Sequence, residues 1–215
     1  MMSQNLESTI SKHELGEEEL SEKFADVFDE YKRPIFNYLL RMTQNRELAD
    51  DLIQETFIRV HKGLQNFRGD SSLSTWIYRI ASNVSFDYFR SKRSYQEQLT
   101  DSIDNAETNR MKVLDKGGLL PEQAADQREM SACVQRFIGE LPPDYRAVIV
   151  LSDLQGLKNR EIADVLEISL DTVKIRLHRA RKQLRAALNL GCDFSHDERN
   201  VMVCEEKPAE QEKAE

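Results

Sequence analysis

The chain has 215 residues, of which 40% are hydrophobic and 32% are charged, and this composition is typical of a soluble, mostly helical protein. The N-terminus lacks a basic segment followed by an apolar run, and no stretch approaches the roughly 18–20 apolar residues of a membrane span. We therefore expect neither a signal peptide nor membrane insertion. The three cysteines are widely spaced, which argues against a disulfide framework and for the cytoplasm.

The net charge of −8 is unevenly distributed along the chain. Residues 1–30 carry −7 and residues 191–215 carry −5, which leaves +4 on residues 31–190. A basic body suits a nucleic-acid partner. Acidic ends can compete with DNA for that body and so reduce non-specific binding.

Apolar residues recur at helical spacing, and no strand-like alternation of any length is visible. We therefore predict an all-α fold of two small helical domains joined by a flexible linker, with a helix-turn-helix in the second domain. In chain order we expect a disordered acidic N-terminus at 1–20, the first domain at 21–94, the linker at 95–127, the second domain at 128–190, and an acidic tail containing Cys and His at 191–215.

Helix signals divide the first domain. Ser21 suits an N-cap, and Pro34 is expected to interrupt the helix, with a second helix beginning near the proline and ending at Asn45. Two further helices are predicted over Glu47–Leu64 and over residues 73–92, separated by a turn-rich loop.

The second domain ends in a short helix, a three-residue turn and a long basic helix, which is the layout of a DNA-reading helix-turn-helix. Asp144 is expected to cap the helix that precedes the helix-turn-helix, and Ser169 is expected to cap the long helix. An αα-hairpin with a solvated charged face is the alternative, although such a face normally carries both positive and negative side chains. The basic face comprises Lys174, Arg176, His178, Arg179, Arg181, Lys182 and Arg185.

Three blocks of sequence together resemble a known family. They are DDLIQETFIRVHKGLQNFRG (Asp50–Gly69), SSLSTWIYRIASNVSFDYFRSKR (Ser71–Arg93) and LPPDYRAVIVLSDLQGLKNREIADVLEISLDTVKIRLHRARKQL (Leu141–Leu184). This set is similar to the extracytoplasmic-function (ECF) group of bacterial sigma-70 factors, over roughly Phe24–Leu190. The resemblance implies a first domain that binds core RNA polymerase and the promoter −10 element, and a second that binds the −35 element and the polymerase flap. It also implies a factor that is not an enzyme, requires no cofactor, is monomeric when free and can be held inactive by an anti-sigma factor.

Two surfaces are predicted on the first domain. By similarity, Asp51, Gln54 and Glu55 would bind the largest polymerase subunit, although an acidic helix face is more often only solvated. By similarity, the loop at residues 67–74 and the helix after it would read the −10 element. Opening a duplex takes a base out of its stack, and small polar residues can shape a pocket for that base, an amide can pair with its edge, and arginines can neutralise phosphates. The predicted −10 set is Gly69, Asp70, Ser71, Ser72, Arg79, Asn83, Arg90 and Arg93.

The −35 element would be read from the long basic helix, with base contacts near its N-terminal part and phosphate contacts further along. Its one exposed apolar position could touch a thymine methyl group. The predicted −35 set is Asp171, Thr172, Lys174, Ile175, Arg176, Arg179, Arg181 and Lys182.

The tail adds Cys192, His196 and Cys204, which are ligand types for zinc and other borderline metals. Only three candidate ligands are visible, whereas a structural zinc site has four. Two interpretations therefore stay open: a tail without a metal-related role, and a sensor of metal or redox state.

Two other functional classes stay open. One is a stand-alone helix-turn-helix transcriptional regulator, which would bind duplex DNA without polymerase. The other is a metal-dependent catalyst that uses Asp50, Asp51, Glu55 and His61, and it is disfavoured because no histidine set accompanies these acids and no Walker loop or HExxH motif is present.

Overall fold

The computed structural model describes residues 16–99, 134–196 and 202–206. Helices make up nearly all of these ranges, which confirms the predicted all-α class. The last two helices form a helix-turn-helix. Most of the predicted linker and of the N-terminus expected to be disordered lie outside the described residues. Within the described residues, no helix is both long and apolar enough to cross a membrane.

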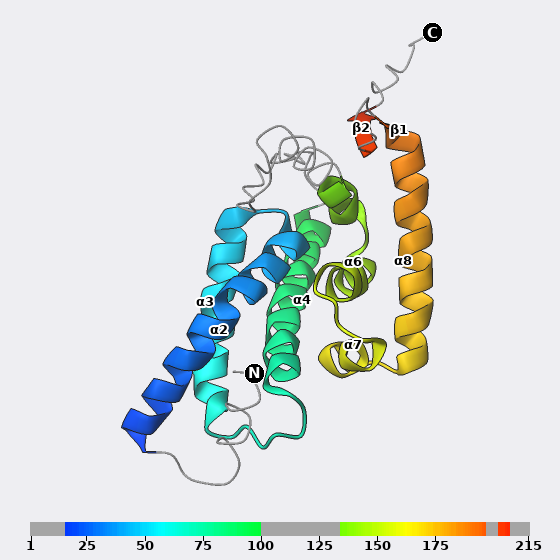
Figure 1. The fold of residues 1–215 in the computed structure, drawn as a ribbon. Coiled ribbons are helices and arrows are strands. Elements are labelled where there is room, and N and C mark those ends of the chain that lie inside the picture. The colour runs from blue at the N-terminus through cyan, green and yellow to red at the C-terminus, as the bar shows by residue number, and fades with distance from the viewer. Residues whose placement is uncertain (1–15, 100–133, 197–201, 207–215) are drawn as a thin grey trace.

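Three helices form the first unit: α2 (Glu17–Thr43), α3 (Arg46–Leu64) and α4 (Leu73–Leu99). They pack side by side because each carries an apolar stripe at helical spacing (Figure 1). The long helix α4 lies between the other two and the second unit (Figure 1). It continues past residue 92, where the sequence predicted its end.

Two predictions about α2 are wrong. The helix begins at Glu17 with Gly16 as N-cap, so Ser21 lies inside it, and it continues unbroken through Pro34. A proline inside a helix removes one backbone hydrogen bond and costs about 3 kcal/mol. Burial of Tyr31, Ile35 and other side chains on both sides of the proline offsets that cost.

The boundary between α2 and α3 is fixed by capping. Gln44 adopts a left-handed backbone conformation (φ 56°) and ends α2 by donating its N–H to the Leu40 carbonyl. Asn45 then starts α3, because its Oδ1 accepts a hydrogen bond of 3.0 Å from the N–H of Leu48. The predicted stop at Asn45 is therefore the start of the next helix.

The second unit begins with a helical segment at residues 134–140 and α6 (Pro143–Ile149), which runs into a π-helical turn, η1 (Val150–Leu154). The prediction that Asp144 caps this helix is wrong, because Pro142 is the N-cap and Asp144 lies in the first turn. Pro143 suits the first helical position because the first N–H groups of a helix have no partner within the helix.

The helix-turn-helix consists of α7 (Asn159–Leu166) and α8 (Leu170–Gly191). Glu167 ends α7 in a left-handed conformation (φ 53°). Ser169 caps α8 as predicted, since its Oγ accepts from the N–H of Thr172 at 3.1 Å. The turn thus contains only residues 167–169.

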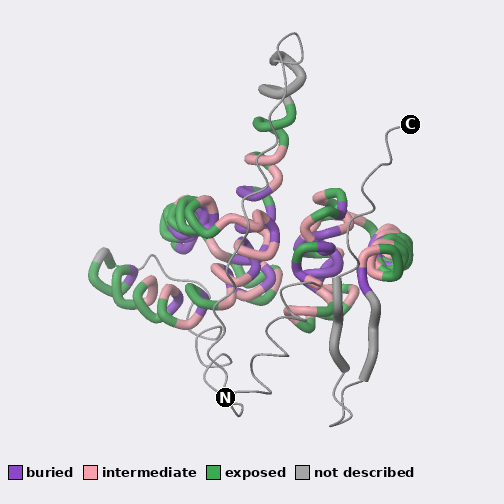
Figure 2. The backbone as a smooth tube through the Cα atoms, turned by 90° about the horizontal axis from the view of Figure 1, so that it is seen from above, coloured by how far each residue is buried: buried purple, intermediate pink, exposed green. Residues whose placement is uncertain are grey.

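The two units share one hydrophobic core, in which buried residues from both units pack together. Figure 2 shows the buried residues concentrated where the helices face one another. The main contacts between units are made by α4 with α7, and further contacts join α2 to α6 and to η1. Sequence periodicity predicted the two units but not that they pack together.

The tail contains an antiparallel hairpin. No strand was predicted there, because the sequence shows no long alternation of apolar and polar residues. Strand β1 (Cys192–His196) follows α8 directly and pairs with β2 (Met202–Glu206). Cys192 is buried in a small apolar cluster with Phe137, and side chains of α8 pack against that cluster. The tail is therefore anchored to the second unit at Cys192, the first residue of β1.

Candidate polymerase and nucleic-acid interfaces

The outer face of α8 carries the predicted −35 set. Its apolar stripe, Val173, Leu177 and Ala180, is buried against the second unit, which leaves the basic residues outward. Ile175 is 51% exposed, as a contact to a thymine methyl would require. A groove of about 510 Å³ lies on this side, with these lining residues: Asn159, Lys174, Leu177, His178, Arg181, Lys182 and Arg185.

Two of the predicted DNA-binding arginines are held by acids to which the sequence had not assigned them. Arg176 lies 3.0 Å from the Asp144 carboxylate. Arg181 binds Asp153 through two nitrogens, at 2.5 and 3.1 Å. Partial burial acts to raise the pKa of Asp153, but hydrogen bonds from Arg181 and Ser152 outweigh it, and the net pKa lies below its usual value. These pairs orient the guanidinium groups before any DNA is bound.

The predicted −10 residues lie on the loop before α4 and on one face of that helix. Gly69 (φ 74°) and Asp70 are exposed in the loop. Ser72 has a structural role as well, because its Oγ accepts from the N–H of Thr75 at 3.1 Å in the first turn of α4. Along α4, the spacing of Arg79, Asn83, Arg90 and Arg93 puts them on one face, here called the α4 stripe.

The members of the α4 stripe differ in their surroundings. Asn83 is exposed. Arg90 is also exposed, 3.7 Å from Asp87. Arg79 lies against the second unit, where its Nε donates to the carbonyl oxygen of Asp164 at 2.9 Å. The structure therefore presents the middle of the stripe to solvent and covers its beginning with α7.

The predicted polymerase-binding residues lie together on α3. Asp51 and Gln54 are exposed, and Glu55 is half-exposed. Glu55 accepts a 2.7 Å hydrogen bond from Arg59, which also reaches Asp87 on α4 at 3.5 Å. The hydrogen bond to Glu55 raises the pKa of Arg59. The face thus combines the exposed carboxylate of Asp51, the amide of Gln54, and the carboxylate of Glu55, which is paired with Arg59.

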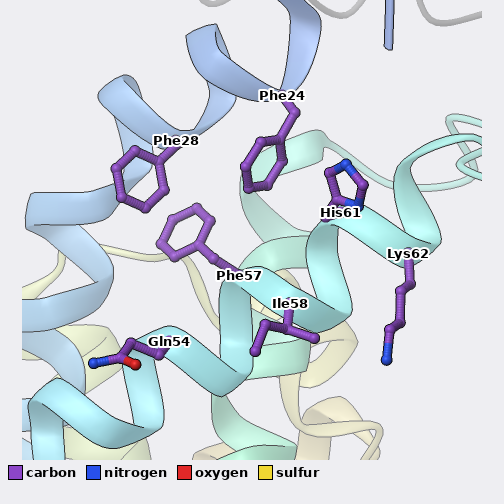
Figure 3. Close-up of a pocket in the computed structure, with 7 residues that line it drawn as sticks. All are labelled: Phe24, Phe28, Gln54, Phe57, Ile58, His61 and Lys62. Atoms are coloured by element: carbon purple, nitrogen blue, oxygen red, sulfur yellow. The ribbon is translucent and has the colours of Figure 1, made fainter. Parts of the chain in front are cut away.

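An apolar groove that was not predicted from the sequence adjoins this face. It measures about 430 Å³ and runs between α2 and α3 (Figure 3). Phe28 and Phe57 meet edge to face at 4.8 Å, and Ile58 is 49% exposed beside them. Gln54 lines the groove and belongs to the acidic face, so the two features form one continuous surface.

The prediction that Cys192, His196 and Cys204 bind a metal is not tested by the described residues. Among the side chains that the structure describes, no group of three or more His, Cys, Asp or Glu residues could hold a metal ion. The side chains of His196 and Cys204 lie outside that description. The strand register places Cys204 opposite Phe194 and His196 opposite Met202.

Comparison with known proteins places the two units in one family. A model of sigma-70 region 2 matches residues 27–95, and a model of sigma-70 region 4 matches residues 131–184. The ECF RNA polymerase sigma factor SigW of Bacillus subtilis (strain 168) is 38% identical over 167 residues, which are 77% of this chain and 88% of SigW. The chain belongs to the ECF group of the sigma-70 family. The resemblance read from the three sequence blocks is confirmed.

Other relatives agree with this sigma-factor assignment. RNA polymerase sigma factor YlaC of the same organism is 34% identical over 76% of this chain and 91% of YlaC. Among solved structures, sigma factor RpoE of Bartonella quintana, in complex with the anti-sigma factor NepR, matches with a TM-score of 0.61 and 20% identity over 78% of this chain and 97% of RpoE. CnrH, in complex with the cytosolic domain of CnrY, matches with a TM-score of 0.59 and 21% identity over 88% of this chain and 99% of CnrH. At these identities the two structures show a shared fold.

Proposed function

We propose that this sigma factor binds core RNA polymerase through the α3 face, reads the −10 element with the α4 stripe and the preceding loop, and reads the −35 element with α8. The observation that carries the proposal is the separation of three surfaces on one chain. An acidic and apolar surface lies on α3, and two polar, arginine-bearing faces lie on α4 and α8.

The chemistry of each surface fits its task. Asp51 and Glu55 would pair with basic side chains of the polymerase, which orients the encounter, and the adjoining groove would bury apolar partner side chains. Asn83 can pair with the edge of a base taken out of the stack, while Arg90 and Arg93 neutralise phosphates. The factor itself makes and breaks no covalent bond, since RNA synthesis belongs to the polymerase.

The remaining partners follow from the same assignment. We propose that the protein works in the bacterial cytoplasm, where promoter DNA and polymerase are found. An anti-sigma factor is a further expected partner, because the structural neighbour RpoE was solved with one. The prediction that Cys192, His196 and Cys204 bind zinc or sense redox state stays a prediction, and elemental analysis of chelator-free protein tests it.

A gel shift of promoter DNA, with and without core polymerase, tests the proposal against a stand-alone regulator. We expect a specific shift only when core polymerase and the factor are present together, because the −10 face reads opened DNA and the −35 face alone supplies only part of the promoter contacts. A stand-alone regulator would shift the same duplex without polymerase. That outcome would reject the proposed function.

A further inference from the structure

The tail hairpin, at the C-terminal end of α8 (Figure 1), sorts its residues onto two faces. Strands β1 and β2 pair in antiparallel register, from Cys192 opposite Glu206 to His196 opposite Met202. Residues directly opposite one another belong to the same face of a hairpin, and residues along each strand alternate between the faces. One face, here called the ligand face, therefore takes every second position of both strands. Its members are Cys192, Phe194, His196, Met202, Cys204 and Glu206.

The ligand face holds every Cys, His and Met residue of the two strands. Thiolate, thioether and imidazole are the groups that bind soft and borderline metals. The opposite face carries none of these groups. Its members are Asp193, Ser195, Val203 and Glu205. The register thus brings together residue types that the alternation of the strands could have divided between the two faces.

The two ends of β1 are too far apart to serve one ion. Cys192 and His196 are four positions apart, and a strand rises about 3.3 Å per residue, so about 13 Å separates them along β1. Bonds from zinc to sulfur or nitrogen are only about 2.0–2.3 Å long. Because side chains in a strand stand roughly perpendicular to the sheet, residues at this separation do not converge on one ion.

Cys192 has a packing role instead. Its side chain is buried with Phe137 at the end of α8. A disulfide with Cys204 does not suit the register, because Cys204 lies opposite Phe194 and so diagonally from Cys192. Diagonal neighbours have Cα atoms about 7–8 Å apart, whereas the Cα atoms of a disulfide usually lie about 4.4–6.8 Å apart.

Three ligand types lie close together at the other end of the ladder. His196 and Met202 are directly opposite each other, and such pairs have Cα atoms about 4.5–5.5 Å apart. Cys204 follows Met202 by two positions, which is about 6.6 Å along β2. Cys204 is also diagonal to His196, at about 7–8 Å. A thiolate, a thioether and an imidazole thus belong to one small area of the ligand face.

We propose that His196, Met202 and Cys204 form a site for one monovalent copper ion, Cu(I). Thiolate and thioether ligands select Cu(I), and imidazole suits copper as well, whereas harder divalent ions prefer oxygen ligands. This set differs in one member from the ligands predicted from the sequence, because Met202 takes the place of Cys192. The exchange of a thiolate for a thioether changes the preferred metal from zinc to copper.

The surroundings of the site favour a cation. Three acidic residues, Asp193, Glu205 and Glu206, lie in the two strands, and their negative charge attracts positive ions. The inference rests on the proposed function only for its setting, the reducing cytoplasm, in which copper is monovalent.

Copper titration of the full chain tests the site. The protein is purified without chelator, reduced, and titrated with Cu(I) in the absence of oxygen against bicinchoninate, a coloured Cu(I) chelator. We expect the chain to take one Cu(I) from the chelator and to keep it in the presence of excess Zn²⁺. A chain that takes no copper, or that exchanges it for zinc, would overturn the proposal.

Matched variants identify the ligands. Met202→Leu removes the thioether at nearly constant size, and Cys204→Ser removes the thiolate. Each should weaken Cu(I) binding by at least about tenfold, since one ligand of three is lost. Cys192→Ser should keep the copper, as should Met130→Leu, the same change outside the hairpin. Copper retained in Met202→Leu and lost in Cys192→Ser would reject this ligand set.

Selenium labelling tests the role of Met202 without a change of fold. Protein with selenomethionine in place of methionine is loaded with Cu(I), and X-ray absorption is measured at the copper edge. We expect selenium in the copper coordination shell together with sulfur and nitrogen, and no selenium in labelled Met202→Leu. A copper shell without selenium in the labelled wild type would contradict the site.

These outcomes separate the copper site from the proposed function. A factor that directs promoter-specific transcription with core polymerase, yet takes no Cu(I), would refute the copper site alone. A factor that binds Cu(I) as expected but never shifts promoter DNA with polymerase would refute the proposed function alone.

Discussion

Replacing Asp51 and Glu55 with arginine should reduce binding to core RNA polymerase by at least about 100-fold. The double change reverses two charges on the α3 face and sets arginines against the basic partner side chains that we expect there, and like charges across an interface cost several kcal/mol. Co-purification with core polymerase and a direct binding titration measure the effect.

The variant needs a control for charge and for folding. Glu22→Arg with Asp26→Arg makes the same charge change at the same spacing on the exposed side of α2, and it should leave polymerase binding intact. Glu55 also pairs with Arg59, so helix content and thermal unfolding must be compared. If the α3 variant folds and still co-purifies normally, α3 is not the polymerase contact.

Arg176→Ala should weaken −35 binding by about 1–3 kcal/mol at a promoter where this side chain reads a guanine with two hydrogen bonds. Discrimination at that one base pair should be lost, because alanine cannot reach the base. In the free factor Asp144 holds the guanidinium at 3.0 Å, so the arginine is positioned before binding. Binding of the polymerase–factor complex to promoters varied at each −35 position measures the effect.

Lys182→Ala is the matched comparison on the same helix. An exposed lysine that contacts phosphate carries no sequence information, so all promoters should weaken alike. The slope of log affinity against log salt should become shallower by about one. A uniform loss in the Arg176→Ala variant as well would show that Arg176 contacts only the backbone.

Local signals in the sequence predicted several helix boundaries. Apolar spacing and the turn-rich loop gave α3 and the start of α4 to within a residue. Ser169 gave the start of α8, because a serine before a periodic segment is a specific cap signal. Pro34 misled the prediction, since the cost of an internal proline is local whereas the burial that offsets it depends on the whole unit.

Features that depend on tertiary packing were not predictable in this way. Arg146 stands in an apolar run, Tyr-Arg-Ala-Val-Ile-Val, which is a signal of a buried arginine but does not name its partner on α2. The pairing of Arg79 with α7 joins residues 85 positions apart. The tail hairpin has strands of only five residues in an acidic segment, too short for a clear alternation.

The most direct test of the central claim is transcription in vitro with core RNA polymerase on a library of promoters. We predict transcripts only when this factor is added, from promoters that share a −10 and a −35 element. Asn83→Ala should change the preferred −10 sequence alone, and Arg176→Ala the preferred −35 sequence alone. Transcription that does not depend on the factor, or a shared preference change in both variants, would contradict a sigma factor that reads the two elements with α4 and α8.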